Sequence, residues 1–393
     1  MVHSVFSRPE LSPAFIKDHN QEAKEVWDAF HSGKPIRPPV KLGTNTQYFI
    51  FNRNLNPHLQ INFREYMTDP KVMFEFSLKS IVWRAFHVAP YCDDPIELPD
   101  EFTLRVDLQN IEEAIYFGAP VKFLTDQVPD SLPILTGEKK YDLFGKSFPD
   151  PLRTGWYITA MHIYEEWLEY LALNPTYQDR PIKIEPFGYW TSGFFTMAIA
   201  LRGMEFLTDI YEDPQYVHDL LAFLTEATIQ RVKAFHHFFN LPYPGKDLFF
   251  ADDAIQLIST KTLKEFLLPH YQHYKNSIVD SEHIKIHLCG DASRHFKCLK
   301  DDLGVNDFET GFPIDFGMVR QQLGPEVTIQ GGPNVMILKE ASPEEVAAET
   351  KRILNSGVLT GGKFILREGN NLAPNTPYYN LDAMYQAARQ FKF

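Results

Sequence analysis

The stretch His283-Ile-Lys-Ile-His-Leu288, with Cys289-Gly-Asp291 directly after it, decides the fold that we expect for this chain. The run up to Leu288 is apolar and favours a β-strand, and residues 292–303 behind it have a helical pattern. A strand that passes through a short polar turn into a helix is the building unit of a parallel sheet. His287 and Cys289 are two residues apart, so on a strand their side chains point to the same side.

The same strand–turn–helix unit recurs from residue 180 onward. Its strands are short apolar runs and its helices are amphipathic, as in a sheet that is covered by helices. This recurrence, with one more strand-like run at residues 38–43, predicts an α/β fold, the (β/α)8 TIM-like barrel. An open doubly wound sheet is the alternative, but no G-x-G-x-x-G turn follows an early strand. The predicted strands are 182–187, 248–252, 283–288, 305–309, 327–330 and 363–366, and the predicted helices are 193–202, 214–239, 262–279, 292–303, 315–323, 343–356 and 378–391.

Two regions are expected along the chain: an N-terminal helical extension, residues 1–35, and the barrel, residues 36–393. Residues 64–89 are predicted to form one helix, because apolar side chains recur along it. Residues 90–155 are rich in Asp, Pro and aromatic residues and show no clear period, so no element is predicted there.

The composition of the chain limits the kinds of partner that we expect. The chain has 393 residues and a formal net charge of −13, so a nucleic acid is not an expected partner. Its three cysteines are too few for a disulfide framework and fit a reducing, intracellular compartment. No apolar run is long enough to span a membrane, and the N-terminus lacks the apolar core of a signal peptide. We therefore expect a cytoplasmic protein that acts on a small molecule, as a monomer or a homodimer.

Polar residues follow the predicted strands at the end where the active site of such a barrel lies. We predict catalytic roles for Asp252, Asp253 and Glu309. Either aspartate could instead cap the next helix, whereas an unpaired buried glutamate on an apolar strand would be costly. Asp291 has the same capping alternative. The residues predicted to bind substrate are Lys41, Asn45, Tyr189, Asp291, Gly331, Glu368 and Asn370.

His287 and Cys289 make half of a candidate zinc site. A catalytic zinc ion usually has three protein ligands and one open position, so a third ligand must come from another strand end. A thiolate ligand gives the metal soft character, which suits the activation of a thiol. A buried, hydrogen-bonded core histidine is the alternative for His287. The candidates for the third ligand are Asp252, Asp253, Glu309, Glu368 and Asn370.

Several of these motifs resemble the uroporphyrinogen decarboxylase superfamily. They include the His287-Leu-Cys-Gly-Asp291 motif and residues 250–259, 319–324, 343–346 and 361–366. The resemblance extends over residues 248–390 and implies a (β/α)8 barrel with its site at the carboxyl ends of the strands. The superfamily contains metal-free decarboxylases and corrinoid-dependent methyltransferases.

The chain resembles the methyltransferase branch more than the decarboxylases. The decarboxylases carry arginines near the N-terminus that hold substrate carboxylates, and residues 38–48 here have Lys41 but no such arginine. His287 and Cys289 match the first two zinc ligands of the methyltransferases. Their third ligand is a cysteine near the last strand, where this sequence has Asn370. A carboxylate ligand, a different methyl donor or acceptor, and a site without metal are the alternatives that follow.

The resemblance implies a methyltransferase that moves a methyl group between a corrinoid carrier protein and a small thiol or methylated substrate, with zinc activation. The chain has no Asp-x-His-x-x-Gly corrinoid signature, so a partner protein would supply the corrinoid. The aromatic residues of 187–195 either line a pocket for an aryl methyl ether or pack in the core.

One rival is a metal-free decarboxylase of a porphyrinogen or polycarboxylate, and another is a non-catalytic barrel that binds a small molecule. The decarboxylase would need a basic cluster at the barrel mouth, drawn from Lys41, Arg53, Arg202 or Arg367.

Overall fold

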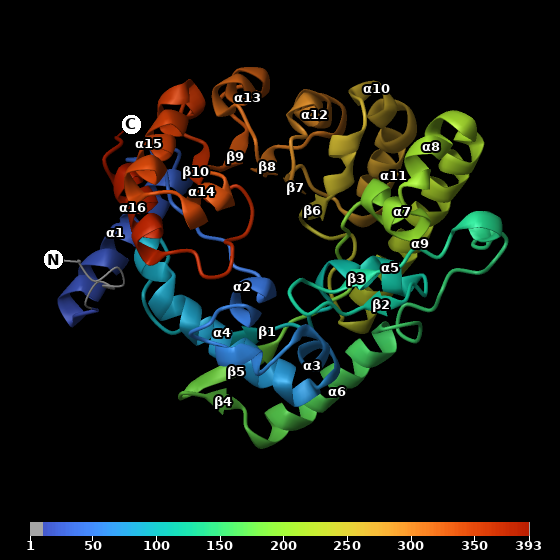
Figure 1. Ribbon diagram of the computed structural model, residues 1–393, viewed down its shortest axis with the longest axis horizontal. Helices are drawn as coiled ribbons and strands as arrows, with labels where there is room; N and C mark the ends of the chain where they lie inside the picture. Colours follow the sequence, from blue (N-terminus) through green and yellow to red (C-terminus); the bar gives the residue numbers. More distant parts are fainter. Residues whose placement is uncertain (1–10, 393) are drawn as a thin grey trace.

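Parallel strands lie in a ring at the centre of the computed structural model, which describes residues 11–392 (Figure 1). Five of them are hydrogen-bonded in the order β10-β9-β8-β7-β6, and β1 pairs in parallel with β5. Val40 extends the ladder beyond β10 by pairing with Leu366, and Thr191, which follows β5, pairs with Phe250 of β6. These strands are the framework of a (β/α)8 barrel, so the predicted fold class is confirmed. The strands are β1 (Phe102–Leu104), β2 (Val121–Lys122), β3 (Asp130–Ser131), β4 (Thr176–Tyr177), β5 (Arg180–Ile184), β6 (Leu248–Ala251), β7 (Ile284–Leu288), β8 (Asp307–Thr310), β9 (Thr328–Gly331) and β10 (Phe364–Leu366).

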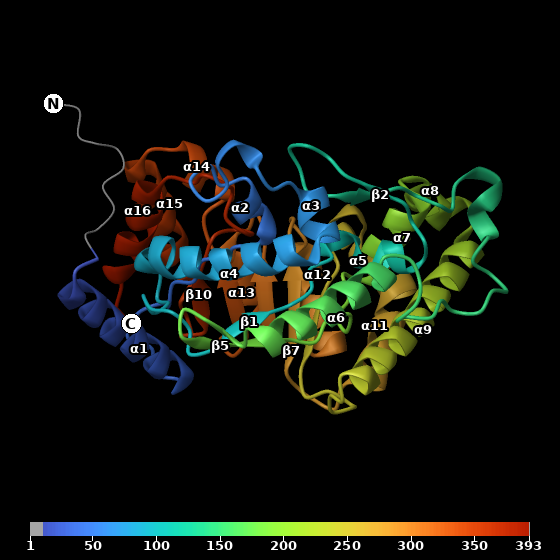
Figure 2. The same cartoon turned by 90° about the horizontal axis from the view of Figure 1, so that it is seen from below.

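Helices surround the ring and cover its outer face (Figure 2). Many begin where the local sequence supplies a cap: Ser342 and Glu345 form a capping box at α15, and Asp213 caps α9 ahead of Pro214. Single π-helical turns continue α10, α12 and α15. The helices are α1 (Pro13–His31), α2 (Thr46–Ile50), α3 (Phe63–Thr68), α4 (Pro70–His87), α5 (Glu112–Tyr116), α6 (Tyr157–Leu173), α7 (Phe194–Arg202), α8 (Glu205–Glu212), α9 (Pro214–Phe238), α10 (Thr260–Thr262), α11 (Leu268–Ile278), α12 (Ser293–Cys298), α13 (Phe316–Leu323), α14 (Val335–Glu340), α15 (Pro343–Ile353) and α16 (Tyr378–Arg389).

The structure differs from the predicted elements at two places before residue 180. The single helix predicted for 64–89 is two helices, α3 and α4, because Asp69 ends the first and caps the second, which starts at Pro70. The region 90–155 contains β1, a barrel strand of only three residues that has no measurable period. Residues 1–10 of the predicted N-terminal extension lie outside the described residues. No helix within residues 11–392 is both long and apolar enough to cross a membrane.

The buried carboxylate of Asp93 joins the first strand of the barrel to the last helix. Arg37 donates to both of its oxygens, at 2.6 and 2.8 Å. The Val40 amide donates to it at 2.7 Å and the Tyr385 hydroxyl of α16 at 2.9 Å. Because Val40 pairs with β10, this one carboxylate connects the two ends of the barrel sequence.

Replacing Asp93 with alanine is expected to lower the free energy of unfolding by about 3 kcal/mol, because the buried Arg37 would keep only Glu22, 3.0 Å away, as a carboxylate partner. Chemical denaturation followed by circular dichroism measures the change. The double variant Arg37→Met/Asp93→Ala should lose less than Asp93→Ala alone, since it removes both buried charges together. An equal or larger loss in the double variant would contradict the ion-pair explanation.

Candidate active site

The pairing of β6, β7 and β8 places predicted site residues side by side. His287 on β7 pairs with Ala251 on β6 and with Glu309 on β8. Side chains at paired positions of parallel strands point to the same face of the sheet. Arg367, directly after β10, contacts Glu309 with 2.5 Å between Nη1 and Oε1, although β9 lies between β10 and β8. The face that these side chains share is therefore the interior of the barrel.

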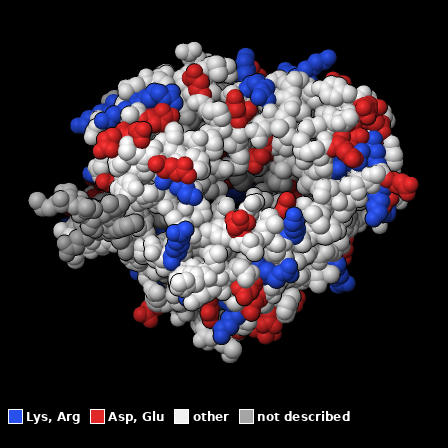
Figure 3. Space-filling model, in the orientation of Figure 1, with Lys and Arg blue, Asp and Glu red and all other residues white. Residues whose placement is uncertain are grey.

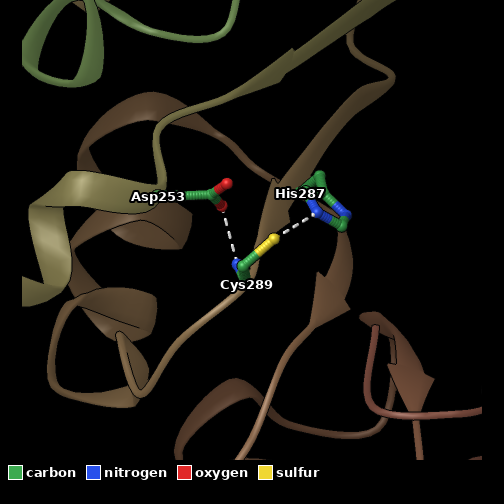
Figure 4. A group of neighbouring side chains, drawn as sticks. All are labelled: Asp253, His287 and Cys289. Carbon is green, nitrogen blue, oxygen red and sulfur yellow. Dashed lines mark hydrogen bonds between the residues drawn. The ribbon is translucent and has the colours of Figure 1, made fainter. Parts of the chain in front are cut away.

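Asp253, His287 and Cys289 form a cluster whose ligand-type atoms all lie within 4.8 Å of one another (Figure 4). His287 Nε2 is 2.9 Å from Cys289 Sγ, and the Cys289 amide donates to Asp253 Oδ1 at 2.7 Å. Asp253 begins a 3₁₀ turn, Asp253–Leu257, that follows β6. The cluster thus comes from the carboxyl ends of two neighbouring strands. It presents one oxygen, one nitrogen and one sulfur atom that could bind a metal ion.

Glu309 fixes the orientation of His287. Its Oε1 lies 2.9 Å from His287 Nδ1, and its Oε2 lies 2.6 Å from Lys285 Nζ. Burial would raise the pKa of Glu309, but the His287 hydrogen bond and the Arg367 and Lys285 charges outweigh it and hold that pKa well below its usual range. The ionised carboxylate can only accept, so Nδ1–H of His287 donates a hydrogen bond to it, and Nε2 is the nitrogen that faces Cys289. Histidines that bind metals are commonly held by such a carboxylate.

Cys289 lies in an environment that favours the protonated thiol. Burial raises the pKa of this thiol well above its usual range, and the negative charge of Asp253 raises it further. The sulfur therefore keeps its proton, and the S–H group faces His287 Nε2 at 2.9 Å as a hydrogen-bond donor. A divalent cation between the three side chains would take the place of that proton, because a metal ion stabilises the thiolate.

The loop after β10 brings Asn370, but not Glu368, to the cluster. The Asn370 side chain lies close enough to the Cys289 thiol to lower the pKa of that thiol, against the effect of burial. Glu368 is fully buried, where it accepts from the Gly43 amide at 3.0 Å and from Arg367 at 2.6 Å. Burial raises the pKa of Glu368 to about 7. Glu368 thus anchors the loop, and Asn370 is its residue beside the candidate ligands.

Asp252 lies next to Asp253 in the chain but is directed at the start of α7. The amides of Phe195 and Thr196 donate to its carboxylate at 2.9 and 2.8 Å. The Thr196 and Tyr271 hydroxyls also donate to it, each at 2.7 Å. Burial raises the pKa of Asp252 to about 6. These contacts are those of a helix cap, and a catalytic role for Asp252 stays a prediction.

The other residues predicted to bind substrate have local contacts of their own. Asn45 caps α2, and Asp291 accepts from the hydroxyl of the serine that begins α12 at 2.6 Å. Gly331 ends β9, where a Cβ atom would clash with the Thr310 hydroxyl. Lys41 is exposed. Substrate contacts of these residues stay predictions.

The structure places one predicted residue away from the cluster and adds another that was not predicted. Tyr189 does not join the cluster but lines a cavity near the amino end of β6, with Phe249 and Trp190. Lys285, which contacts Glu309, was not predicted as a site residue. Its signal was its position two residues before His287, which places both side chains on the same face of β7.

Two of the three arginines named for the decarboxylase alternative, Arg202 and Arg367, are engaged by carboxylates of the protein itself, whereas Arg53, like Lys41, is exposed. Arg202 contacts Asp209 at 2.8 Å, and Arg367 contacts both Glu309 and Glu368. These guanidinium groups are already neutralised, so they do not offer a clamp for a substrate with several carboxylates.

The fold and the cluster define the class of this protein: a (β/α)8 barrel with oxygen, nitrogen and sulfur donors at its strand ends. The family model described as uroporphyrinogen decarboxylase (URO-D) matches residues 186–391, just over half of the 393 residues. The chain therefore belongs to the uroporphyrinogen decarboxylase family.

Within this family the chain is similar to methylcobamide:CoM methyltransferases. It is 24% identical to MtbA of Methanosarcina acetivorans and 23% identical to MtbA of Methanosarcina mazei, over 209 residues in each case. These matches cover 51% of this chain and 57% of each relative, so the chain spans little more than half the length of the curated relatives. A uroporphyrinogen decarboxylase of Dechloromonas aromatica is 32% identical over only 88 residues, which are 22% of this chain and 24% of that protein.

A solved structure supports the fold along almost the whole chain. A methyltransferase from Methanosarcina mazei is similar with a TM-score of 0.62 and 19% sequence identity. The similarity covers 94% of this chain and 98% of that one. The barrel and the elements before residue 180 therefore share one architecture with that protein.

Replacing Asp252 with alanine is expected to lower the free energy of unfolding by about 2–4 kcal/mol, because the donors at the start of α7 lose their acceptor. The loss should depend on pH. The pKa of Asp252 is about 6 in the folded protein and lower when unfolded, so the wild-type protein loses stability as pH rises from about 4 to 6. The gap between wild type and variant should thus be larger at about pH 5 than at about pH 8. Denaturation curves at both pH values measure this gap, and a gap that widens with pH would refute the assignment.

Proposed function

We propose that this protein is a corrinoid-dependent methyltransferase that moves a methyl group between a corrinoid carrier protein and a small thiol or methylated substrate, with activation by zinc. The Asp253–His287–Cys289 cluster carries the proposal. The cluster lies at the strand ends of the barrel, and this chain is similar to two methylcobamide:CoM methyltransferases. The methylated substrate can carry an aromatic ring, as an aryl methyl ether does.

The donor set of the cluster fits a zinc ion. Imidazole nitrogen, thiolate sulfur and carboxylate oxygen are the donors that zinc takes in proteins, and three such ligands leave a position open for substrate. His287 would bind through Nε2, because Glu309 already engages Nδ1. Asp253 would supply the third ligand, so that one thiolate and one carboxylate balance the charge of the ion. When bound, zinc supplies Lewis acidity that lowers the pKa of a substrate thiol or polarises a methyl-bearing oxygen.

The residues around the cluster would position the reactants. Glu309 holds the His287 ring in place and stays ionised because Lys285 and Arg367 flank it. Asn370 lies beside Cys289, where its amide can hydrogen-bond a substrate atom next to the sulfur. Methyl transfer needs two reactants in line, and side chains held by such contacts lower the entropic cost of that alignment.

The carrier protein would approach the face that bears α2 and α14, which follow the first barrel strand and β9. In the space-filling view this face is hollowed at its centre (Figure 3). The strand ends that carry the cluster lie on this side of the barrel. We place the protein in the cytoplasm, because Cys289 must remain a free thiol to act as a ligand.

Protein purified without chelator and reconstituted with zinc is expected to keep about one ion per chain after dialysis. His287→Ala, Cys289→Ser and Asp253→Asn should each lower the metal content, because each removes one of three ligands. Elemental analysis by mass spectrometry measures the content. Cys298→Ser is the matched control, since this second thiol lies on α12 outside the cluster. Wild-type protein that keeps almost no zinc, or variants that keep as much as wild type, would refute the metal centre.

The full chain is expected to demethylate methylcobalamin, a soluble stand-in for the carrier, in the presence of a small thiol. The change in the cobalamin absorption spectrum reports the reaction. His287→Ala should reduce the rate by about 100-fold, since loss of a ligand removes the Lewis acid, while Cys298→Ser should retain it. Methoxyphenol in place of the thiol, with reduced cobalamin as the acceptor, tests transfer in the opposite direction.

Incubation of the same preparations with uroporphyrinogen distinguishes the decarboxylase alternative from methyl transfer. If wild type and His287→Ala both release carbon dioxide from uroporphyrinogen and neither reacts with methylcobalamin, the protein is a metal-free decarboxylase and the proposed function is wrong. Binding of small molecules without turnover of either substrate would favour the non-catalytic alternative.

A further inference from the structure

A cavity of about 710 Å³ lies near the amino-terminal end of β6. Part of its wall is formed by the segments that lead from α9 into β6 and from α11 into β7. Segments that lead from helices into strands lie on the face of a barrel opposite its active site. β6 begins at Leu248 beside the cavity, and Asp253 follows its other end, about 15 Å away along an extended chain. The cavity is therefore separate from the candidate active site.

Aromatic rings form much of the cavity wall: Tyr189, Trp190, Phe249 and Tyr274. The Phe249 side chain is 45% exposed, whereas its neighbours on β6, Leu248 and Phe250, are buried. An exposed phenyl ring within a concave, mainly apolar wall leaves apolar area in contact with water, and a bound ring would cover it. A concave, mainly apolar wall with a few polar groups is the usual form of a small-molecule binding site.

Cations lie over two of these rings. The Arg105 guanidinium lies over the Tyr189 ring at 5.9 Å, and Lys285 Nζ lies 5.4 Å from the centre of the Phe249 ring. The edge of the Tyr189 ring also meets His236 at 5.9 Å. Such contacts restrain the rings and so reduce the entropy that they lose when a planar molecule stacks on them.

The charged residues of the wall balance one another. Arg105 pairs with Glu185 at 3.0 Å, and Lys246 and Asp247 are neighbours of opposite sign. These two cations and two anions sum to no net charge, and they offer hydrogen-bond partners to a polar edge. This arrangement favours a ligand without net charge.

We propose that this cavity is a binding site for an uncharged, planar aromatic molecule. Its rings stack against Phe249 and Tyr189, and its polar edge meets the Arg105–Glu185 pair. The volume is in the range of pockets that enclose ligands of two or three rings. The site goes beyond the proposed methyl transfer and does not depend on it.

The test is a binding titration of the full chain with 2-naphthol, followed by the fluorescence of the probe. Wild-type protein is expected to bind it saturably at one site. Phe249→Ala and Tyr189→Ala should each weaken binding about tenfold, because each removes a stacking face. Tyr211→Ala, an exposed aromatic residue on α8, is the matched control and should bind as wild type. 2-Naphthoate, which adds a carboxylate to the same rings, should bind more weakly than 2-naphthol.

His287→Ala separates the cavity from the candidate active site and should bind 2-naphthol as wild type does. The proposal is overturned if wild type shows no saturable binding, or if His287→Ala abolishes binding while Phe249→Ala and Tyr189→Ala keep it. Tighter binding of 2-naphthoate would overturn the uncharged ligand class. Circular dichroism establishes that each variant is folded. The assay contains neither metal nor corrinoid, so failed binding and failed methyl transfer are distinguishable.

Discussion

The Glu309 carboxylate makes the contacts on which the rest of the site depends. It joins His287 and Lys285 of β7 to Arg367 after β10, across the interior of the barrel. A buried carboxylate is costly unless it is paired and hydrogen-bonded, and two cations with one histidine satisfy this one. Because Glu309 is ionised, it accepts a hydrogen bond from Nδ1–H of His287, and Nε2 is directed at Cys289. The orientation of the candidate ligands therefore follows from one carboxylate.

Asp252 and Asp253 show how neighbours in the sequence take different positions once a strand ends. Asp252 turns towards α7 and caps it, and a side chain at Gly193, which has φ +95°, would collide with that carboxylate. Asp253 stays at the barrel mouth and accepts from the Cys289 amide. The first aspartate supports the structure that presents the second one.

Lys285 lies between the two ends of the barrel interior. Its ammonium group contacts Glu309 on the side of the candidate ligands and lies over the Phe249 ring on the side of the aromatic cavity. The paired positions Phe249, Lys285 and Asp307 form one level of the interior, and Ala251, His287 and Glu309 form the next. The barrel thus keeps a polar, charged layer between a mainly aromatic cavity and a cluster of potential metal ligands.

The sequence by itself determined the alternation of strands and helices after residue 180, and that His287 and Cys289 share a side, because apolar periodicity and side-chain direction are local properties. It did not reveal β1, which is three residues long, or the choice of Asp253 over Asp252 at the cluster. Nor did it pair Glu309 with Lys285 and Arg367. Only the tertiary structure decided these points, because strand register and barrel closure bring together residues that are far apart in the chain.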